Sequence, residues 1–292
     1  MKLSKIHMLA ASLVFFGGVS GWIDAALPRT LLPELLENML LYKTTNARFH
    51  SGHLFEHSIW VTRSTVNLLQ SKWEKGIDRD KFLKLLVIAA LLHDIGKAGD
   101  LEYAYFEKKD HPMRGFEYIL GLKKYFINKD AVFDFQKLFE QLGLSDDDRK
   151  FVAIMAGMHH ELGVVMRGPR YITRSGFGFV QIREHVLKKL DNFIRLSHYM
   201  GCCIGRNNDC YKQLVYCFSL LAAADVCGAQ VVKHDKEIDT VINNIIGIDI
   251  SEYANSHGNA LAEGLNAYAF FDYAVTGFEA RNALASCVSM SD

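Results

Sequence analysis

Apolar and polar residues follow one another along this chain with the spacing of amphipathic helices. In segment 53–73, for example, Leu54, Ile59, Val61 and Val66 recur among polar positions. No internal repeat and no low-complexity linker interrupts the succession of such segments. The pattern therefore predicts an all-α fold, with helices over residues 33–42, 53–73, 82–92, 112–120, 145–160, 182–200 and 211–229.

The segment 82–92 differs from the others because it is apolar nearly all round. Its residues from Leu85 to Leu92 are all hydrophobic. A helix that has no polar face is buried on every side. We therefore expect this helix to lie at the centre of the fold.

Capping residues and breakers mark the ends of several segments. Pro112 suits the first turn of a helix, with Asp110 or His111 near its cap. Ser145, followed by three aspartates, predicts the start of a helix that ends near His160. Residues 163–179 contain four glycines, one proline and three arginines, which predict a long loop.

Composition narrows the classes of function. The 33 lysines and arginines equal the 33 aspartates and glutamates, so the formal net charge is zero. A broad nucleic-acid surface normally requires a basic excess, and we therefore expect no nucleic-acid partner. A hydrophobic fraction of 50% and only four prolines suit a compact, mostly helical protein.

The N-terminal residues 1–26 allow two interpretations. Lys2 and Lys5 precede an apolar run over about residues 8–19, and small residues follow, which is the order of a secretory signal. The run is too short for a comfortable membrane span. The alternative is a first helix buried in the domain, so a cytoplasmic and an exported location both stay open.

Candidate metal ligands recur along the helical segments. His93 and Asp94 end the apolar run; they cannot share one helix face, but at a helix end both can turn toward one ion. A buried Asp225, in an alanine-rich run, would be costly without a cation. Imidazoles and carboxylates together suit one or two divalent metals. The other candidates are His57, His111, His159 and His160.

These motifs resemble those of the HD-domain metal-dependent phosphohydrolases. The resemblance rests on Glu56-His57-Ser58, on Leu92-His93-Asp94-Ile95-Gly96-Lys97 and on Asp225, and it covers residues from about 50 to 230. His111-Pro112-x-x-Gly115 and His159-His160-Glu161 are similar to the dinuclear branch, which includes the HD-GYP cyclic dinucleotide phosphodiesterases.

The resemblance also implies an organisation of the chain. An HD-domain helical bundle would cover residues 27–235, after the signal peptide or N-terminal helix. A C-terminal helical extension, packed as a cap, would cover residues 236–292.

Carried over residue by residue, the resemblance implies two divalent metals, such as Fe, Mn or another transition metal, with Mg as an alternative. The first would take His57, His93, Asp94 and Asp225. The second would take His111 and either His159 or His160, with Asp94 as a bridge between the two metals.

Further residues would complete a hydrolytic site in which a metal-activated hydroxide attacks a phosphoester. Lys97 is expected to reach the phosphate, with a solvated lysine as the alternative. His53 shares a helix face with His57 and is the candidate general acid, as in the paired histidines of eukaryotic cyclic nucleotide phosphodiesterases. Three arginines of the expected loop would clamp phosphate groups, or else form a solvated basic loop: Arg167, Arg170 and Arg174.

One departure from the HD-GYP pattern limits the choice of substrate. Leu162-Gly163-Val164-Val165 follows Glu161 where those proteins carry a Gly-Tyr-Pro signature, so cyclic di-guanylate is not favoured. We expect a phosphohydrolase or phosphodiesterase that acts on a small-molecule phosphoester, a nucleotide or cyclic nucleotide, with no membrane association beyond a signal. A di-iron oxygenase with the same ligands and a non-catalytic ligand-binding module are the alternatives.

Overall fold

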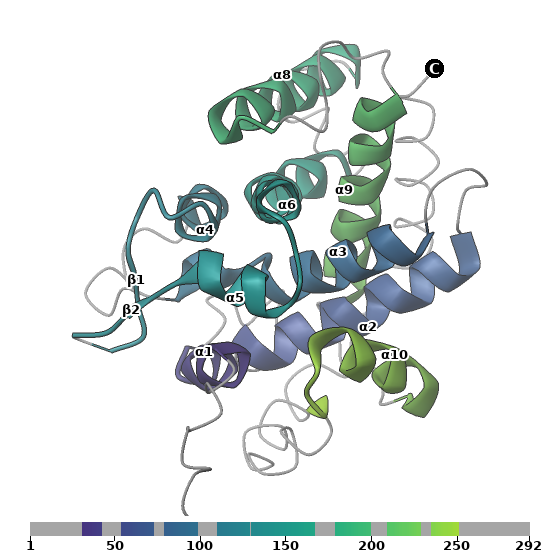
Figure 1. Cartoon of the computed structure of the whole chain (residues 1–292). Helices are drawn as coiled ribbons and strands as arrows, with labels where there is room; N and C mark the ends of the chain where they lie inside the picture. The colour runs from purple at the N-terminus through teal and green to yellow at the C-terminus, as the bar shows by residue number, and fades with distance from the viewer. Residues whose placement is uncertain are drawn as a thin grey trace, which may run out of the picture. The chain divides into compact units, whose positions relative to one another are not determined.

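The computed structural model describes residues 31–42, 54–72, 79–98, 110–128, 130–166, 179–199, 209–228 and 235–250. These stretches are helical apart from one two-stranded hairpin, which confirms the all-α fold class (Figure 1). The helices are α1 (Leu31–Leu40), α2 (Leu54–Lys72), α3 (Arg79–Leu92), the 3-10 helix η1 (Ile95–Lys97), α4 (His111–Ile119), α5 (Phe135–Gln141), α6 (Asp146–Met166), α8 (Phe179–Ser197), α9 (Asp209–Gly228) and α10 (Lys236–Ile246).

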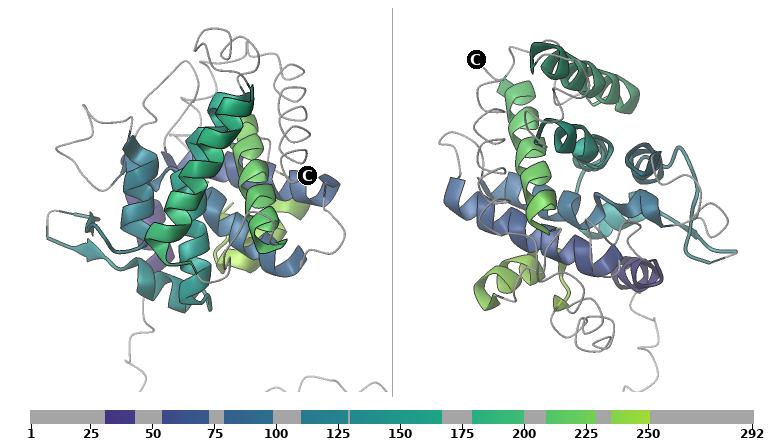
Figure 2. Two further views of the ribbon diagram at one scale, coloured as in Figure 1. Left: turned by 90° about the horizontal axis from the view of Figure 1, so that it is seen from above. Right: turned by 180° about the vertical axis from the view of Figure 1, so that it is seen from behind.

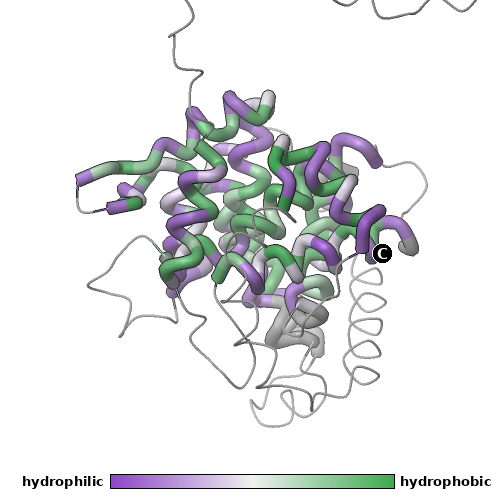
Figure 3. The backbone as a smooth tube through the Cα atoms, turned by 90° about the horizontal axis from the view of Figure 1, so that it is seen from below, coloured by the Kyte–Doolittle hydropathy of each residue, from purple (hydrophilic) through white to green (hydrophobic). Residues whose placement is uncertain are grey.

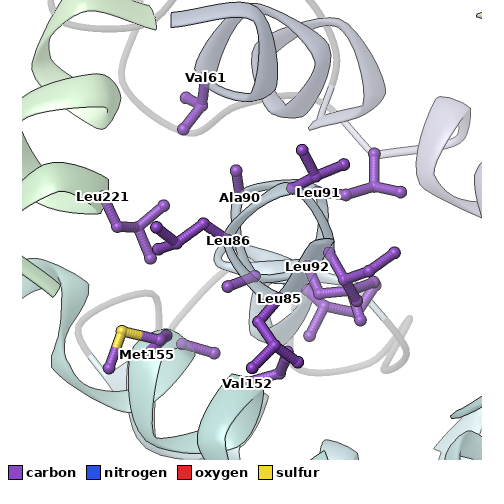
Figure 4. Packing of buried hydrophobic residues seen from close by; sticks show 14 of the residues in the cluster. Val61, Leu85, Leu86, Ala90, Leu91, Leu92, Val152, Met155 and Leu221 are labelled. Carbon is purple, nitrogen blue, oxygen red and sulfur yellow. The ribbon is translucent and has the colours of Figure 1, made fainter. Parts of the chain in front are cut away.

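Helix α3 lies at the centre, as its sequence predicts. Every side chain from Leu85 to Leu92 is buried. Figure 4 shows Val61 of α2, Leu221 of α9 and Met155 of α6 arranged around it. Each buried leucine stabilises the fold by about 1.5–3 kcal/mol relative to an exposed one, so α3 anchors the helices that carry the candidate ligands.

Around α3, the other long helices pack in contact with one another. Helix α2 lies against both α3 and α9, and α6 lies against α3, α4, α8 and α9 (Figures 1 and 2). Hydrophobic segments gather where these helices meet, and hydrophilic segments lie mainly outside (Figure 3). This packing brings segments that are far apart in the sequence to one region.

A short hairpin and helix α5 were not predicted from the sequence. Strands β1 (Tyr125–Phe126) and β2 (Val132–Phe133) pair antiparallel, with Tyr125 opposite Phe133. The hairpin extends away from the helices in both views of Figure 2. The Tyr125 hydroxyl donates a hydrogen bond to Asn38 Oδ1 at 2.5 Å, which attaches the hairpin to α1.

Several expected helix boundaries differ from the structure by two to six residues, and two of them flank the expected loop. Helix α6 continues to Met166, so residues 163–166 are helical rather than part of a loop. Helix α8 begins at Phe179, three residues before the expected start at Ile182. Gly163 weakens a helix without forbidding it, because its low helix propensity costs only about 1 kcal/mol relative to alanine.

Helix α10 belongs to the C-terminal segment that was expected to pack as a cap, and it lies against α2. The Asp235 side chain accepts hydrogen bonds from the first turn, and Gly247 ends the helix in the left-handed conformation. A buried ion pair joins the two helices, in which Arg63 binds both carboxylate oxygens of Asp239 at 2.7 Å.

The expectations for the two ends of the chain are not tested by the described residues. Residues 1–26 and the chain beyond residue 250 lie outside them, so both interpretations of the N-terminus stay predictions. None of the described helices combines the length and the apolar character that crossing a bilayer requires.

Candidate metal centre

Six predicted ligands from separate parts of the chain meet at one place. Helix α2 supplies the first, the turn between α3 and η1 supplies two, and α4, α6 and α9 supply one each. The five residues other than the α9 aspartate are at most 2% exposed. The six are His57, His93, Asp94, His111, His159 and Asp225.

Four of these residues form what we call the first group: His57, His93, Asp94 through Oδ2, and Asp225. The Nε2 atoms of His57 and His93 lie 3.2 Å apart. Asp94 Oδ2 lies 3.4 Å from His57 Nε2 and 3.5 Å from His93 Nε2. Asp225 Oδ1 lies 3.1 Å and 3.5 Å from the same two nitrogens. The four side chains thus present their donor atoms to one small volume.

The second group consists of His111, His159 and Asp94 through Oδ1. Asp94 Oδ1 lies 2.9 Å from His111 Nε2 and 3.2 Å from His159 Nε2. The two nitrogens lie 3.2 Å apart. The two oxygens of one carboxylate therefore face two different sets of imidazoles.

The structure distinguishes the members of the doublet His159-His160. His159 is buried and reaches Asp94, whereas His160 is exposed. The ring centroid of His160 nevertheless lies only 4.3 Å from that of His111. All three histidines of this set are close enough to share one ion. The second group can thus include His160 as a further donor on the solvent side.

The hydrogen bonds of the imidazoles indicate which form they take. The Nδ1 atoms of three histidines face backbone carbonyl oxygens, which only accept hydrogen bonds. Nδ1 therefore carries the proton, and Nε2 presents a lone pair to the centre. The pairs are His57 with Gly228 at 3.1 Å, His93 with Ala90 at 2.7 Å and His159 with Ala156 at 2.6 Å.

This arrangement fits a bound metal ion. His57 Nε2 and His93 Nε2 face each other at 3.2 Å, and two unprotonated nitrogens at this distance repel unless a proton or a metal ion lies between them. Among the described residues, Asp94 Oδ1 and Asp225 Oδ1 are also buried oxygens that receive no hydrogen bond. The donor set, rich in imidazole, suits transition metals better than magnesium.

The electrostatics of the site keep both carboxylates charged. Burial raises the pKa of Asp94, but Lys97, His93 and His111 more than offset this and hold that pKa well below its usual value. Burial likewise raises the pKa of Asp225, and the neighbouring His57 and His93 hold it well below its usual value. Metals bind the deprotonated form, so both groups are in the state that ligation requires.

Two of the histidines that face Asp94, His93 and His111, have pKa values that are shifted in opposite directions. Burial lowers the pKa of His93, but Asp94 and Asp225 raise it to a value above the usual one. Burial also lowers the pKa of His111, and there the attraction of Asp94 does not restore it. Both carboxylates of the first group, Asp94 and Asp225, therefore raise the pKa of His93.

Lys97 lies inside the cluster rather than on its surface. Its Nζ donates a hydrogen bond to Asp94 Oδ2, and its side chain is only 5% exposed. The alternative of a solvated lysine at a helix end is therefore wrong. Its ammonium places a positive charge beside the carboxylate that faces both groups.

Solvent reaches the cluster at two of its members. The Asp225 side chain keeps 17% of its exposure, so it is partly rather than completely buried. His160 is also exposed.

The close backbone contact between Gly96 and His111 was not predicted from the sequence. A Cβ atom at Gly96 would lie 1.9 Å from the carbonyl oxygen of His111 and 2.6 Å from the nitrogen of Gly115. Glycine at position 96 lets η1 lie directly on the first turn of α4. Its place in the His93-Asp94-Ile95-Gly96-Lys97 motif was the only signal, and the partner was not predictable from spacing.

Four predicted site residues cannot be placed. His53 and the three arginines of the expected loop, Arg167, Arg170 and Arg174, lie outside the described residues. Their roles in proton delivery and phosphate binding stay predictions.

Comparison with known proteins agrees with this geometry. The family model of the HD domain matches residues 54–164, a range that contains His57, His93, Asp94, His111 and His159 but ends before α9. Comparisons with curated proteins and with solved structures found no match. Residues 54–164 of this chain are therefore similar to the HD domain, and this match is consistent with the HD-domain metal-dependent phosphohydrolase superfamily.

Proposed function

We propose that this protein is a metal-dependent phosphohydrolase or phosphodiesterase that acts on a nucleotide or cyclic nucleotide. The observation that carries the proposal is the position of Asp94, whose two oxygens face separate sets of imidazoles at 2.9–3.5 Å. One carboxylate in that position can bridge two metal ions. The first group would hold one ion, and the second group, with His160 as a further donor, would hold the other.

Divalent ions bound at such a centre polarise a phosphoryl oxygen and activate water at neutral pH. The chain supplies the rest of the proposed mechanism. Backbone carbonyls fix the orientation of His57, His93 and His159. Lys97, hydrogen-bonded to Asp94, adds positive charge where a phosphate would approach.

Two expected contributors to catalysis remain candidates within this proposal. His53 would deliver a proton to the leaving oxygen, because its spacing from His57 puts both on one helix face. The arginines at positions 167, 170 and 174 would bind further phosphate groups.

We infer that the functional domain extends beyond the matched range to about residue 235. Helix α9 packs against α2 and carries Asp225. A domain that ended at residue 164 would lack one donor of the first group. The segments 1–26, as a signal or first helix, and 236–292, as a helical extension, would flank it.

The same donors also suit iron, so a di-iron oxygenase is the second candidate. The test is hydrolysis of bis-p-nitrophenyl phosphate and of a panel of nucleotides and cyclic nucleotides by manganese-loaded protein. Asp94→Ala should lose at least about 100-fold in kcat/KM, which corresponds to about 2.7 kcal/mol of transition-state stabilisation. Asp130→Ala, at an exposed aspartate of the hairpin loop, is the matched control and should keep full activity.

Two results would count against the hydrolase proposal. One is a protein that binds metal but turns over no phosphoester on the panel. The other is equal activity of Asp94→Ala and wild type. Oxygen consumption by the iron-loaded protein, without hydrolysis, would move the oxygenase to first place.

A further inference from the structure

The last turn of α9 lies directly against the backbone of α2. A Cβ atom at Gly228 would lie 2.5 Å from Val61 Cγ2, 2.8 Å from Val61 N and 2.9 Å from Val61 Cα. Ordinary contacts for such an atom begin at 3.4 Å. Two backbones meet here with no room for a side chain, which is why glycine occupies position 228.

This contact adjoins both helices that form the first group. Val61 follows His57 by one helical turn on α2, and Gly228 follows Asp225 by three residues on α9. The Gly228 carbonyl oxygen lies 3.1 Å from His57 Nδ1, and Asp225 Oδ1 lies 3.1 Å from His57 Nε2. One turn of α9 therefore contacts both nitrogens of the same imidazole.

We propose that Gly228 is a positioning residue for the metal of the first group and acts through its contact with Val61. The inference rests on the proposed function only in taking His57 and Asp225 as metal ligands. Gly228 lies outside residues 54–164, which match the HD-domain model, and its side chain offers no ligand atom.

The size of the effect follows from the contact distances. A side chain at position 228 must move away from Val61 N by about 0.6 Å to reach an ordinary contact. Metal sites tolerate departures of about 0.2 Å from ideal ligand distances. The displacement would carry Asp225 and the Gly228 carbonyl away from His57 together.

The second group should be spared. His111 and His159 lie on α4 and α6, and the Nδ1 partner of His159 is the carbonyl of Ala156 within α6 itself. Helix α6 also packs against α9, but the contacts of His111 with Asp94 and of His159 with Ala156 do not involve an α9 residue. The expected consequence is the selective loss of one metal ion.

The test is metal content per chain, measured by elemental analysis after loading the full chain with Mn²⁺ and removing free ions. Gly228→Ala should hold one equivalent less than wild type. Val61→Ala is the matched control, because it loosens the same contact without forcing the backbones apart, and it should keep the wild-type content. The control separates positioning from a general loss of packing between α2 and α9.

Double variants identify which metal is lost. Adding Asp225→Asn to Gly228→Ala should remove no further metal, because both act on the first group. Adding His111→Ala should remove the remaining equivalent. Circular dichroism checks that each variant is folded. If Gly228→Ala does not fold, Gly228→Ala with Val61→Ala relieves the closest contact, keeps the clash with Val61 N and should show the same loss.

The outcomes separate this inference from the proposed function. Wild-type metal content in Gly228→Ala, or an equal loss in Val61→Ala, would overturn the inference alone. A wild-type protein that holds the metals but hydrolyses no phosphoester would count against the proposed function alone. A wild-type protein that binds no Mn²⁺ would overturn both.

Discussion

The contact between η1 and α4 yields a prediction from two neighbouring glycines that differ in the space around them. A Cβ atom at Gly96 would lie 1.9 Å from the His111 carbonyl oxygen and 2.6 Å from Gly115 N. A Cβ atom at Gly115 would lie 3.4 Å from Gly96 N and 3.5 Å from Ile95 Cγ2, which are ordinary contacts. The same substitution, glycine to alanine, should therefore have opposite effects at the two positions.

For Gly96→Ala, the methyl group must gain about 1.5 Å from the His111 carbonyl to reach an ordinary contact. The obstacles are backbone atoms of α4, so no side-chain rotation relieves them. Overpacking of a core costs about 1–3 kcal/mol, and a clash with backbone atoms should cost about 3 kcal/mol or more because those atoms cannot rotate away. We expect the free energy of unfolding to fall by about 3 kcal/mol. Displacement of His111 should also weaken binding of the second metal.

For Gly115→Ala, no atom needs to move, and alanine favours a helix interior over glycine by about 0.5–1 kcal/mol. We expect unchanged or slightly increased stability. Urea denaturation of the metal-free proteins, followed by circular dichroism, measures both variants with the same baseline. Equal stability of Gly96→Ala and Gly115→Ala would refute the reasoning that links these contacts to the position of α4.

Three further predictions concern metal binding and buried polar pairs. Thermal unfolding with rising Mn²⁺ should show a gain of about 2.7 kcal/mol per tenfold increase in free metal, the slope for two sites, and Asp94→Ala should show almost none. Asp239→Ala should lower the free energy of unfolding by about 3–5 kcal/mol in urea, because Arg63 stays buried without its carboxylate. Tyr125→Phe should cost about 1–2 kcal/mol in the same assay, because Asn38 Oδ1 loses its donor.

Each of these predictions has a contrary result. A slope of about 1.4 kcal/mol per tenfold increase in metal would indicate one site and contradict the bridging position of Asp94. A change of less than about 1 kcal/mol in Asp239→Ala would mean that water solvates Arg63. Wild-type stability of Tyr125→Phe would mean that the hairpin is held by its apolar contacts alone.

The ligand set was predicted from its resemblance to HD-domain motifs, and the structure brings these residues together. The all-round apolar segment before His93 predicted a central helix, and α3 is central. His93 and Asp94 were expected to turn toward one ion at the end of a helix, and the structure places them there. Helix α3 ends at Leu92 and η1 begins at Ile95, so both residues lie in the turn between them.

The rest depended on contacts that local patterns do not encode. The carbonyl partner of His57 comes from Gly228, which is 171 residues away in the sequence. The close approach of Gly96 to α4 depends on how two elements pack, not on the spacing within either. The hairpin at Tyr125–Phe126 is too short to show an alternating pattern, and it is stabilised by the distant Asn38.

The proposed bridging of two metal ions by Asp94 is tested most directly by a crystal structure of the manganese-loaded protein, with anomalous scattering collected at a wavelength that identifies the metal. We expect two anomalous peaks, one among His57, His93 and Asp225 and the other beside His111 and His159, with the Asp94 carboxylate between them. A single peak, or two peaks that do not share Asp94, would contradict it.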